Sequence, residues 1–290
     1  MASPRISIIG GGNIAEAIIS GLVKGGQDPK LVSVADPYTV QLEKLQSKYG
    51  IQTTTNNREC LGNFGELGPQ VIIIATKPQI VSVVMTEVSD LVLKHESLIV
   101  SIAAGVTTEA IRTWVSEPSG SSKNVPITRL MPNTPALIGE GASGLFKNAF
   151  VNEQQAQLAE KVASMISKQY FWFNTQELDI DSVTAVSGSG PAYFFYVMEA
   201  MQAAAVKFGL GEKEATKLVA QTCLGAAKMV LANEDVSIST LRQNVTSPNG
   251  TTHAAIESMK ADKVGESIIK GCEKARERSI EISSELFSKL

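Results

Sequence analysis

Short apolar runs alternate with amphipathic stretches through the first half of the chain. The clearest runs are residues 6–9, 31–35, 71–75 and 98–102. Runs that are apolar at nearly every position are typical of strands buried on both faces of a parallel sheet. Between two of them, apolar side chains recur every three or four residues from Tyr38 to Tyr49, which predicts a helix. The alternation therefore predicts a doubly wound α/β domain.

The character of the chain changes after further strands expected at residues 127–131, weakly around Leu145, and at 170–173. Beyond residue 174, segments rich in Ala, Met, Leu, Lys and Glu predict long helices. These helices are expected at residues 193–208, 212–233 and 263–288.

The first of these helices is apolar around much of its circumference at residues 200–206. Because a surface helix has no need of such a pattern, we expect burial against a second subunit. The predicted organisation is an α/β domain at 1–174 and an all-α dimerisation domain at 175–290.

Composition narrows the class of protein without naming a function. The 290 residues suffice for about two domains, and 43% hydrophobic with 19% charged residues is typical of globular chains. A net charge of −3 offers no electrostatic case for binding nucleic acid or an anionic membrane. With two histidines, a His-rich zinc site is excluded, and no metal is expected.

The same composition bears on the compartment. Three widely separated cysteines argue against a disulfide framework. No apolar run approaches the roughly 20 residues that span a bilayer, so no membrane contact is expected. Residues 1–5 lead at once into a strand and leave no room for a signal peptide. We therefore expect a soluble, cytoplasmic protein.

A glycine-rich loop joins the first strand to the first helix. The stretch from Gly10 to Ala15 matches G-x-G-x-x-A, in which Gly10 allows the tight turn and Gly12 lets a pyrophosphate approach the backbone. The following helix start offers N–H groups to the phosphates. The pattern predicts a Rossmann domain that binds a dinucleotide. The expected contacts are Ile9, Gly10, Gly11, Gly12, Asn13 and Ile14.

Asp36 ends the second predicted strand, 21 residues beyond Ala15. At this position an acidic side chain can bind the ribose 2′-hydroxyl of NAD. The alternative interpretation is that Asp36 and Pro37 merely start a helix, and both can hold at once. Asn57 could add a contact at the adenosine end. NADH use is therefore expected, and exclusive NADPH use is less so.

Two further loops follow strands at the edge where such sheets bind ligands. They are Ala75, Thr76, Lys77 and Pro78 after the third core strand, and Ala103, Ala104 and Gly105 after the fourth. Lys77 is either a phosphate or carboxamide contact or a solvated cation. A stiff loop at residues 131–135 places Asn133 between two prolines, suited to a nicotinamide or substrate edge.

Two segments of the helical half have the composition of binding loops. Residues 187–193 are either a substrate contact or an interhelical turn. Residues 244–252 combine hydroxyl side chains with the start of a helix, whose N–H groups can cradle a carboxylate without any arginine.

These segments together resemble the pyrroline-5-carboxylate reductases, which make L-proline. The resemblance runs from the Gly10 loop through 75–78, 101–107, 131–135, 187–193 and 225–229 to the loop at 245–252. It implies a Rossmann domain, a helical domain that dimerises by interleaving, and a decamer of dimers as a larger assembly. It also implies that 1-pyrroline-5-carboxylate is bound at the dimer interface, where one subunit's cofactor meets its partner's helical loop.

The resemblance assigns roles to particular residues. Thr252 matches the threonine that bonds the pyrroline nitrogen. The carboxylate-binding loop is matched by Asn244, Val245, Ser247, Gly250 and Thr251, and acidic positions near substrate and cofactor by Glu177 and Glu234. Two departures are evident. Asn249 replaces a glycine but tolerates positive φ, and Asp36 stands where NADPH-preferring members often have serine.

The implied reaction is hydride transfer from NADPH or NADH to the C=N bond of the substrate. Thr252 would act as hydrogen-bond donor or proton relay, whereas His253, about 100° away on a helix, is interpreted as a structural or surface histidine. A β-hydroxyacid dehydrogenase-like oxidoreductase is the alternative enzyme, but Phe194 stands where that family has a catalytic lysine. A non-catalytic dinucleotide sensor is the alternative outside catalysis.

Overall fold

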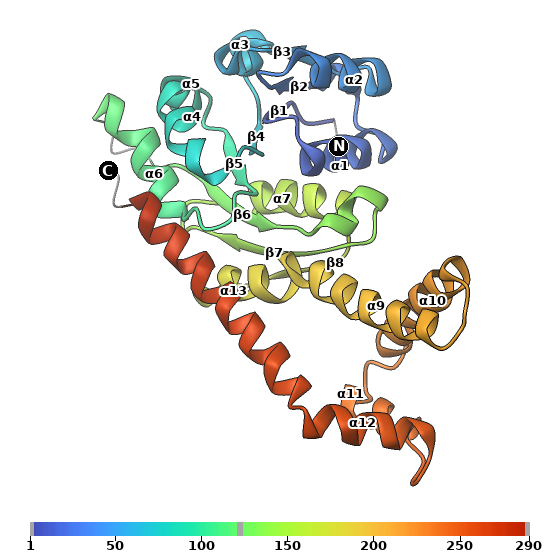
Figure 1. Ribbon diagram of the computed structural model, residues 1–290. Coiled ribbons are helices and arrows are strands. Elements are labelled where there is room, and N and C mark those ends of the chain that lie inside the picture. Colours follow the sequence, from blue (N-terminus) through green and yellow to red (C-terminus); the bar gives the residue numbers. More distant parts are fainter. Residues whose placement is uncertain (1–2, 121–123, 288–290) are drawn as a thin grey trace. The chain divides into compact units, whose positions relative to one another are not determined.

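The computed structural model describes residues 3–120 and 124–287, which form two compact units (Figure 1). The first, here the sheet unit, comprises residues 1–189 and 275–290. The second, here the helical unit, comprises Gly190–Lys274. The long C-terminal helix therefore begins in the helical unit and ends in the sheet unit.

A single sheet in the order β3-β2-β1-β4-β5-β6-β7-β8 organises the sheet unit. All neighbouring strands are parallel except β6 and β7. The strands are β1 (Ile6–Ile9), β2 (Val32–Ala35), β3 (Gln52–Thr54), β4 (Val71–Ile74), β5 (Leu98–Ser101), β6 (Ile127–Met131), β7 (Gly141–Lys147) and β8 (Ser167–Trp172). This arrangement confirms the predicted doubly wound, mostly parallel sheet.

Strand β3 is the one strand of the described sheet that the hydrophobic pattern did not predict. Its residues are Gln, Thr and Thr, all half-buried, and it pairs with β2 at the outer edge of the sheet. An edge strand without apolar side chains carries no periodic signal.

Successive strand residues point to opposite sides of the sheet. Since the strands are apolar on both sides, helices cover both faces. In β4, Ile73 packs with one apolar cluster, whereas Ile72 and Ile74 pack with the other. The first cluster includes α1 (Asn13–Lys24), α2 (Thr39–Tyr49) and α7 (Glu153–Ile166). The second includes α3 (Asn57–Gly62), α4 (Val81–Glu87), α5 (Ser89–His95) and α6 (Thr108–Ser116).

Short tight helical turns connect these elements. The 3-10 turns are η1 (Pro29–Leu31), η2 (Gly65–Leu67), η3 (Pro78–Ile80), η4 (Glu117–Ser119) and η5 (Thr134–Ile138). After β8 the chain continues through α8 (Asp179–Val183) into a π-helical turn, η6 (Thr184–Gly188). The predicted interhelical turn at 187–193 is thus largely helical.

The helical unit contains α9 (Gly190–Lys207), α10 (Glu212–Leu231), α11 (Ile238–Asn244), α12 (Thr251–Ala261) and the start of α13 (Val264–Phe287). These bounds agree closely with the predicted helices, although residue 288 lies outside the described part of the chain. Helices α9 and α10 pair, and Gln202 Nε2 donates to Thr216 Oγ1 at 2.8 Å. Large apolar side chains on both helices are exposed, including Phe194, Met201 and Leu218.

No helix in the described residues is both long enough and apolar enough to cross a membrane.

Candidate active site

Gly10 lies where the order of strands reverses, because β1 sits between β2 and β4. Its φ of +102° is unfavourable for other residues, and a Cβ there would lie 2.6 Å from the carbonyl oxygen of Ala75. The loops after β1 and β4 therefore touch, and only glycine permits the contact. This reversal is the place at which open α/β sheets bind ligands.

Gly12 opens α1 and leaves space in front of it. It is the N-cap residue and has no side-chain cap hydrogen bond, and a Cβ built on it would meet no atom within 4 Å. In the neighbouring loop, Thr76 Oγ1 is buried without a hydrogen-bond partner. Uncapped helix amides, open space and an unused hydroxyl together suit a phosphate group. These residues therefore fit a dinucleotide.

Asp36 joins the phosphate loop to the start of α2. Its Oδ2 accepts a hydrogen bond from Gly11 N at 2.7 Å, and its Oδ1 accepts one from Tyr38 N at 2.9 Å. Gln41 Nε2 donates to the Gly11 carbonyl at 2.6 Å from the same helix. The N-cap residue of α2 is Tyr38, so Asp36 lies two residues before the cap position.

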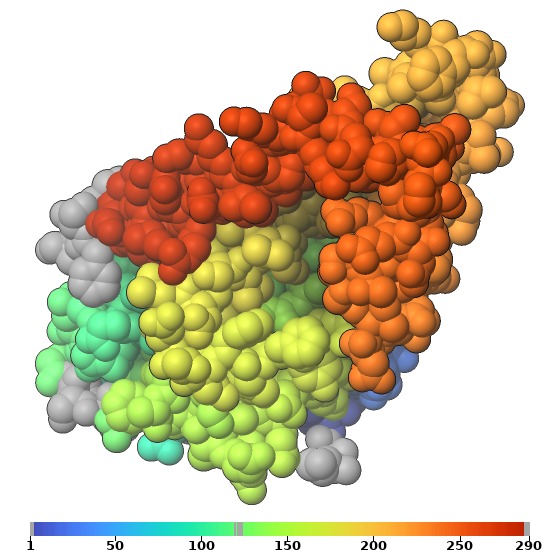
Figure 2. Space-filling model, turned by 90° about the horizontal axis from the view of Figure 1, so that it is seen from below, coloured from blue at the N-terminus to red at the C-terminus, as the bar shows by residue number. Residues whose placement is uncertain are grey.

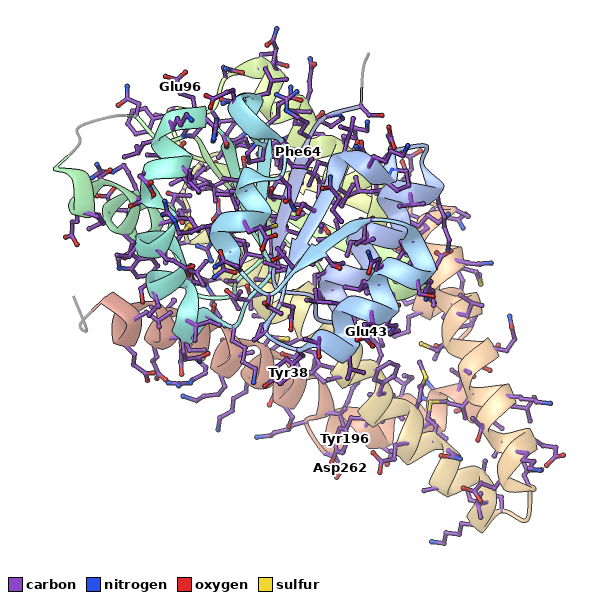
Figure 3. All side chains as sticks on the ribbon, turned by 90° about the horizontal axis from the view of Figure 1, so that it is seen from above. Tyr38, Glu43, Phe64, Glu96, Tyr196 and Asp262 are labelled. Atoms are coloured by element: carbon purple, nitrogen blue, oxygen red, sulfur yellow. The ribbon has the colours of Figure 1, made fainter. Side chains whose placement is uncertain are left out.

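The exposed Tyr38, which follows β2, and Glu96, which precedes β5, lie at opposite ends of the parallel strands (Figure 3). Tyr38 lies at the carboxyl ends of the strands, as do the Gly10 loop and Asp36. Both oxygens of Asp36 are fixed there by backbone donors, which holds its carboxylate beside the glycine-rich loop.

Asn57 and Arg58 begin α3 and are held by acidic side chains. Asn57 Nδ2 donates to Glu87 Oε2 at 2.8 Å. Arg58 binds Asp90 with two hydrogen bonds of 2.7 and 2.8 Å, and this guanidinium lowers the pKa of Asp90 to about 2. The Arg58 charge is thus already neutralised. Lys77 is exposed before η3.

Asn133 holds the stiff loop after β6 in place. Its Oδ1 accepts from Ala142 N at 3.0 Å, and its Nδ2 donates to the carbonyl of Ser187 at 3.3 Å. The first residues of the predicted 187–193 segment therefore lie against this loop. The Asn133 side chain therefore holds this loop against Ala142 and Ser187.

Glu177 belongs to a buried ionic group that sequence reasoning missed. Its carboxylate accepts hydrogen bonds from Thr108 N at 2.6 Å, Thr108 Oγ1 at 2.7 Å and Arg129 Nη1 at 3.2 Å. The Arg129 side chain is 2% exposed. The available signal was a single cation inside the apolar strand 127–131, but its partner lies 48 residues away.

The loop at 244–252 connects α11 to α12 within the helical unit. Asn249 has a φ of +61°, which confirms that asparagine replaces glycine in a left-handed turn here. Gly250 is the N-cap residue of α12 and has no side-chain cap hydrogen bond. Thr251 and Thr252 are exposed on the first turn, and His253 is half-buried.

The predicted site residues thus fall into two sets. The sheet unit brings together the phosphate loop, Asp36 and the loops after β4, β5 and β6, and also carries Glu177. The helical unit carries the threonine loop, and the exposed Glu234 between α10 and α11. A glycine-rich loop at the strand reversal that fits a dinucleotide, next to further strand-end loops, is typical of a nucleotide-dependent oxidoreductase.

Comparison with known proteins narrows this class. Residues 177–282 match the family described as pyrroline-5-carboxylate reductase dimerisation, and residues 5–105 match one described as NADP oxidoreductase, coenzyme F420-dependent. The pyrroline-5-carboxylate reductase of Pseudomonas aeruginosa is 40% identical over 99% of both chains. The solved reductase of Coxiella burnetii is 39% identical, covers 97% of this chain and 99% of its own, and has a TM-score of 0.85.

The chain belongs to the pyrroline-5-carboxylate reductase family. The predicted NAD(P)H-dependent reductase is therefore confirmed, and the two alternatives, a β-hydroxyacid dehydrogenase-like enzyme and a non-catalytic sensor, are set aside. The match to a dimerisation family likewise supports self-association through the helical part of the chain.

Proposed function

We propose that the chain reduces 1-pyrroline-5-carboxylate to L-proline with a nicotinamide dinucleotide held at the strand reversal between β1 and β4. The observation that carries the proposal is the uncapped start of α1 at Gly12, with open space before it, together with the buried, unpartnered hydroxyl of Thr76 in the loop that touches Gly10. A solved Plasmodium falciparum relative, 25% identical over 98% of this chain and 99% of its own with a TM-score of 0.83, has NADP bound.

In this proposal, different residues of the chain bind the phosphates and the ribose of the dinucleotide. The phosphates lie against the backbone from Gly10 to Ile14, and Thr76 Oγ1 donates to the same group. Asp36 receives the ribose hydroxyls. The remaining contacts of this set are Ile9, Asn57, Ala75, Lys77, Pro78, Ala103, Ala104, Gly105 and Asn133. When bound, the reduced nicotinamide supplies a hydride to the C5 carbon of the imine.

Asp36 favours NADH. Two backbone donors fix the position of the Asp36 carboxylate. Each of its oxygens can accept a further hydrogen bond from a ribose hydroxyl, whereas its negative charge repels a 2′-phosphate. The nearby Arg58 is already paired with Asp90, so its charge adds little attraction for that phosphate. NADH and NADPH both serve as cofactors in this proposal, with NADH preferred.

The helical unit binds the substrate. Gly250 leaves the start of α12 without a side-chain cap, and the backbone N–H of Thr251 in the first turn donates to the substrate carboxylate. Thr252 donates its hydroxyl hydrogen bond to the pyrroline nitrogen, which orients the C=N bond and supports its protonation. Asn244, Val245 and Ser247 shape the loop, and Glu234 supplies an acidic group beside it. Glu177 contributes from the sheet unit through Thr108 and Arg129.

The two sets of residues come together between subunits in this proposal. A dimerisation domain at 175–290 places the threonine loop of one subunit at the cofactor of its partner, and dimers assemble further into a decamer of dimers. The exposed apolar side chains of α9 and α10 support the first step. We place the enzyme in the cytoplasm, with no nucleic-acid partner.

Replacement of Thr252 tests the catalytic assignment. Thr252→Ala removes the donor to the pyrroline nitrogen, so kcat is expected to fall by roughly 10²-fold. The Kd for NADH, measured by nicotinamide fluorescence, should stay within about twofold because the cofactor set is untouched. His253→Ala is the matched control on the same helical turn, and it should keep its turnover. Unchanged kcat in Thr252→Ala would remove this residue from the mechanism.

A further inference from the structure

The loop between β5 and α6, residues 102–107, is held from outside by residues distant in sequence. Gly105 has a φ of +71°, and a Cβ there would lie 2.8 Å from Ile282 Cγ2 and 3.1 Å from the Ser279 carbonyl oxygen. Ser283 Oγ donates a 2.6 Å hydrogen bond to the Gly105 carbonyl. The last turns of α13 therefore pack directly on the backbone of this loop.

A buried polar group fixes the other end of the loop. Glu177 accepts two hydrogen bonds from Thr108, the first residue of α6, and a third from Arg129. Arg129 Nη2 lies 3.8 Å from Asp181 Oδ1, and Ser279 Oγ donates to the same oxygen at 2.6 Å. Arg129 is thus shared between two carboxylates: Glu177, which is bonded to the start of α6, and Asp181 of α8, which is bonded to Ser279 of α13.

Helix α13 reaches this group as a single continuous element. Arg276 Nε donates to Ser182 Oγ at 2.9 Å, one turn before the Ser279 contact with Asp181. Figure 2 shows the dark red end of α13 lying against the yellow surface that includes α8. Because the contacts recur along successive turns, this part of α13 is fixed in rotation as well as in position.

We propose that the C-terminal part of α13 positions the β5–α6 loop for the cofactor, with Ser283 as the principal positioning residue. The hydrogen bond of Ser283 fixes the orientation of the peptide after Gly105, while Glu177 fixes the amide of Thr108. The loop is then held at both ends before the dinucleotide arrives, which lowers the ordering cost of binding. The inference rests on the proposed cofactor role of Ala103, Ala104 and Gly105.

Two adjacent serines of α13 provide a matched pair of variants. Ser283 bonds both Gly105 and the Ser279 carbonyl, whereas within the described residues Ser284 Oγ donates only to the Ile280 carbonyl of its own helix, at 3.2 Å. Ser283→Ala and Ser284→Ala therefore each remove a bond within the helix, but only the first releases the loop. Ser283→Thr keeps the hydroxyl and serves as the rescue variant.

The test is the Kd for NADH by fluorescence titration, with kcat at saturating NADH and the melting temperature measured alongside. Ser283→Ala is expected to weaken NADH binding about fivefold to tenfold relative to Ser284→Ala, as one lost hydrogen bond predicts. Its kcat should stay within about twofold, its melting temperature should match that of Ser284→Ala, and Ser283→Thr should restore binding.

Equal Kd values for Ser283→Ala and Ser284→Ala would overturn the inference while leaving the proposed function intact. A loss of NADH affinity that tracks an equal fall in melting temperature in both variants would also overturn it, because the effect would then be one of stability. Failure of the unchanged protein to bind NADH would instead refute the proposed function.

Discussion

The two units of this chain differ in how far they bury their apolar side chains. In the sheet unit, β1, β2, β4 and β5 are buried along their whole length, between two apolar clusters. In the helical unit, the buried hydrophobic side chains of the described residues are Ala215 and Val219, while Phe194 is 60% and Tyr196 is 75% exposed. The first unit is complete within one chain, and the second is not.

The difference shows which part of the molecule needs a second copy. Exposed large apolar side chains that recur along α9 and α10 are typical of an interface. The family match to a dimerisation domain covers the same helices. The proposed cofactor residues lie in the unit that is complete, and the threonine loop lies in the unit that is not. Assembly and cofactor choice are therefore expected to respond to different substitutions.

The largest effect is expected from placing a charge on the exposed apolar face of α9. Phe194→Asp would bury an unpaired carboxylate in the interface, at a cost of roughly 3–5 kcal/mol per subunit. The dimer dissociation constant should rise by at least about 10²-fold, and activity should fall with it. Sedimentation velocity over a concentration series measures the first effect, and NADH consumption measures the second.

The matched control lies in the sheet unit. Val83 of α4 is also an exposed apolar residue, and Val83→Asp introduces the same charge. Because no partner is expected at this face of α4, the dimer dissociation constant and the turnover of Val83→Asp should equal those of the unchanged protein. Equal effects of Phe194→Asp and Val83→Asp would erase the distinction between the two units.

An intermediate effect is expected at Asp36, where a substitution should change the preference between NADH and NADPH and leave dimer formation unchanged. Asp36→Ser removes the fixed negative charge, so the ratio of kcat/KM for NADH over NADPH should fall by about tenfold to a hundredfold. Asp36→Asn keeps the size of the side chain but removes its charge, so comparing it with Asp36→Ser distinguishes the effect of the charge from that of the contacts with the loop. A ratio unchanged in both variants would limit Asp36 to a structural role.

The smallest effect is expected from the ion pairs that join α1 to α2. Glu16 accepts hydrogen bonds from Lys44 Nζ at 2.6 Å and Lys48 Nζ at 3.0 Å, and the Lys44 bond lowers the pKa of Glu16. Glu16→Gln should cost about 1 kcal/mol of unfolding free energy at pH 7. Urea unfolding at pH 7, 5 and 3 measures it.

The pH dependence of this effect has a definite sign. Because the folded pKa lies below the unfolded value of 4.5, the pair stabilises the fold above that value. The contribution is lost as pH falls through the folded pKa, so Glu16→Gln and the unchanged protein should converge at low pH. A difference that persists or grows at pH 3 would contradict the assigned cause.

Much of the fold could be predicted because its signals are local. The apolar runs at β1 and β4, the glycine pattern after β1 and the helical periodicity of α10 each lie within a short window of sequence. The left-handed turn at Asn249 was also predictable, since few residues tolerate its φ. The polar edge strand β3 had no such signal, because its three residues lack apolar side chains.

The rest depended on contacts between distant residues. Arg129 and Glu177 are 48 positions apart, and Ser283 and Gly105 are 178 apart. No periodicity joins such pairs, so the composition of neither segment reveals the partner. For the same reason, the return of α13 to the sheet unit could not be predicted from the helical pattern of residues 263–288.

The central claim, that one subunit's cofactor loops work with its partner's threonine loop, is tested most directly by mixing two inactive variants. Gly12→Asp places a carboxylate in the phosphate cradle, and Thr252→Ala removes the donor to the pyrroline nitrogen. Each variant alone should be nearly inactive. Co-expressed with different affinity tags, they should form mixed dimers that contain one intact site and one doubly altered site.

The measurement is NADH consumption by mixed dimers isolated through both tags. The account predicts recovery of about half the turnover of the unchanged dimer, because one of two equivalent sites is intact. No recovery in verified mixed dimers would mean that each site is built within a single subunit, and would contradict the account.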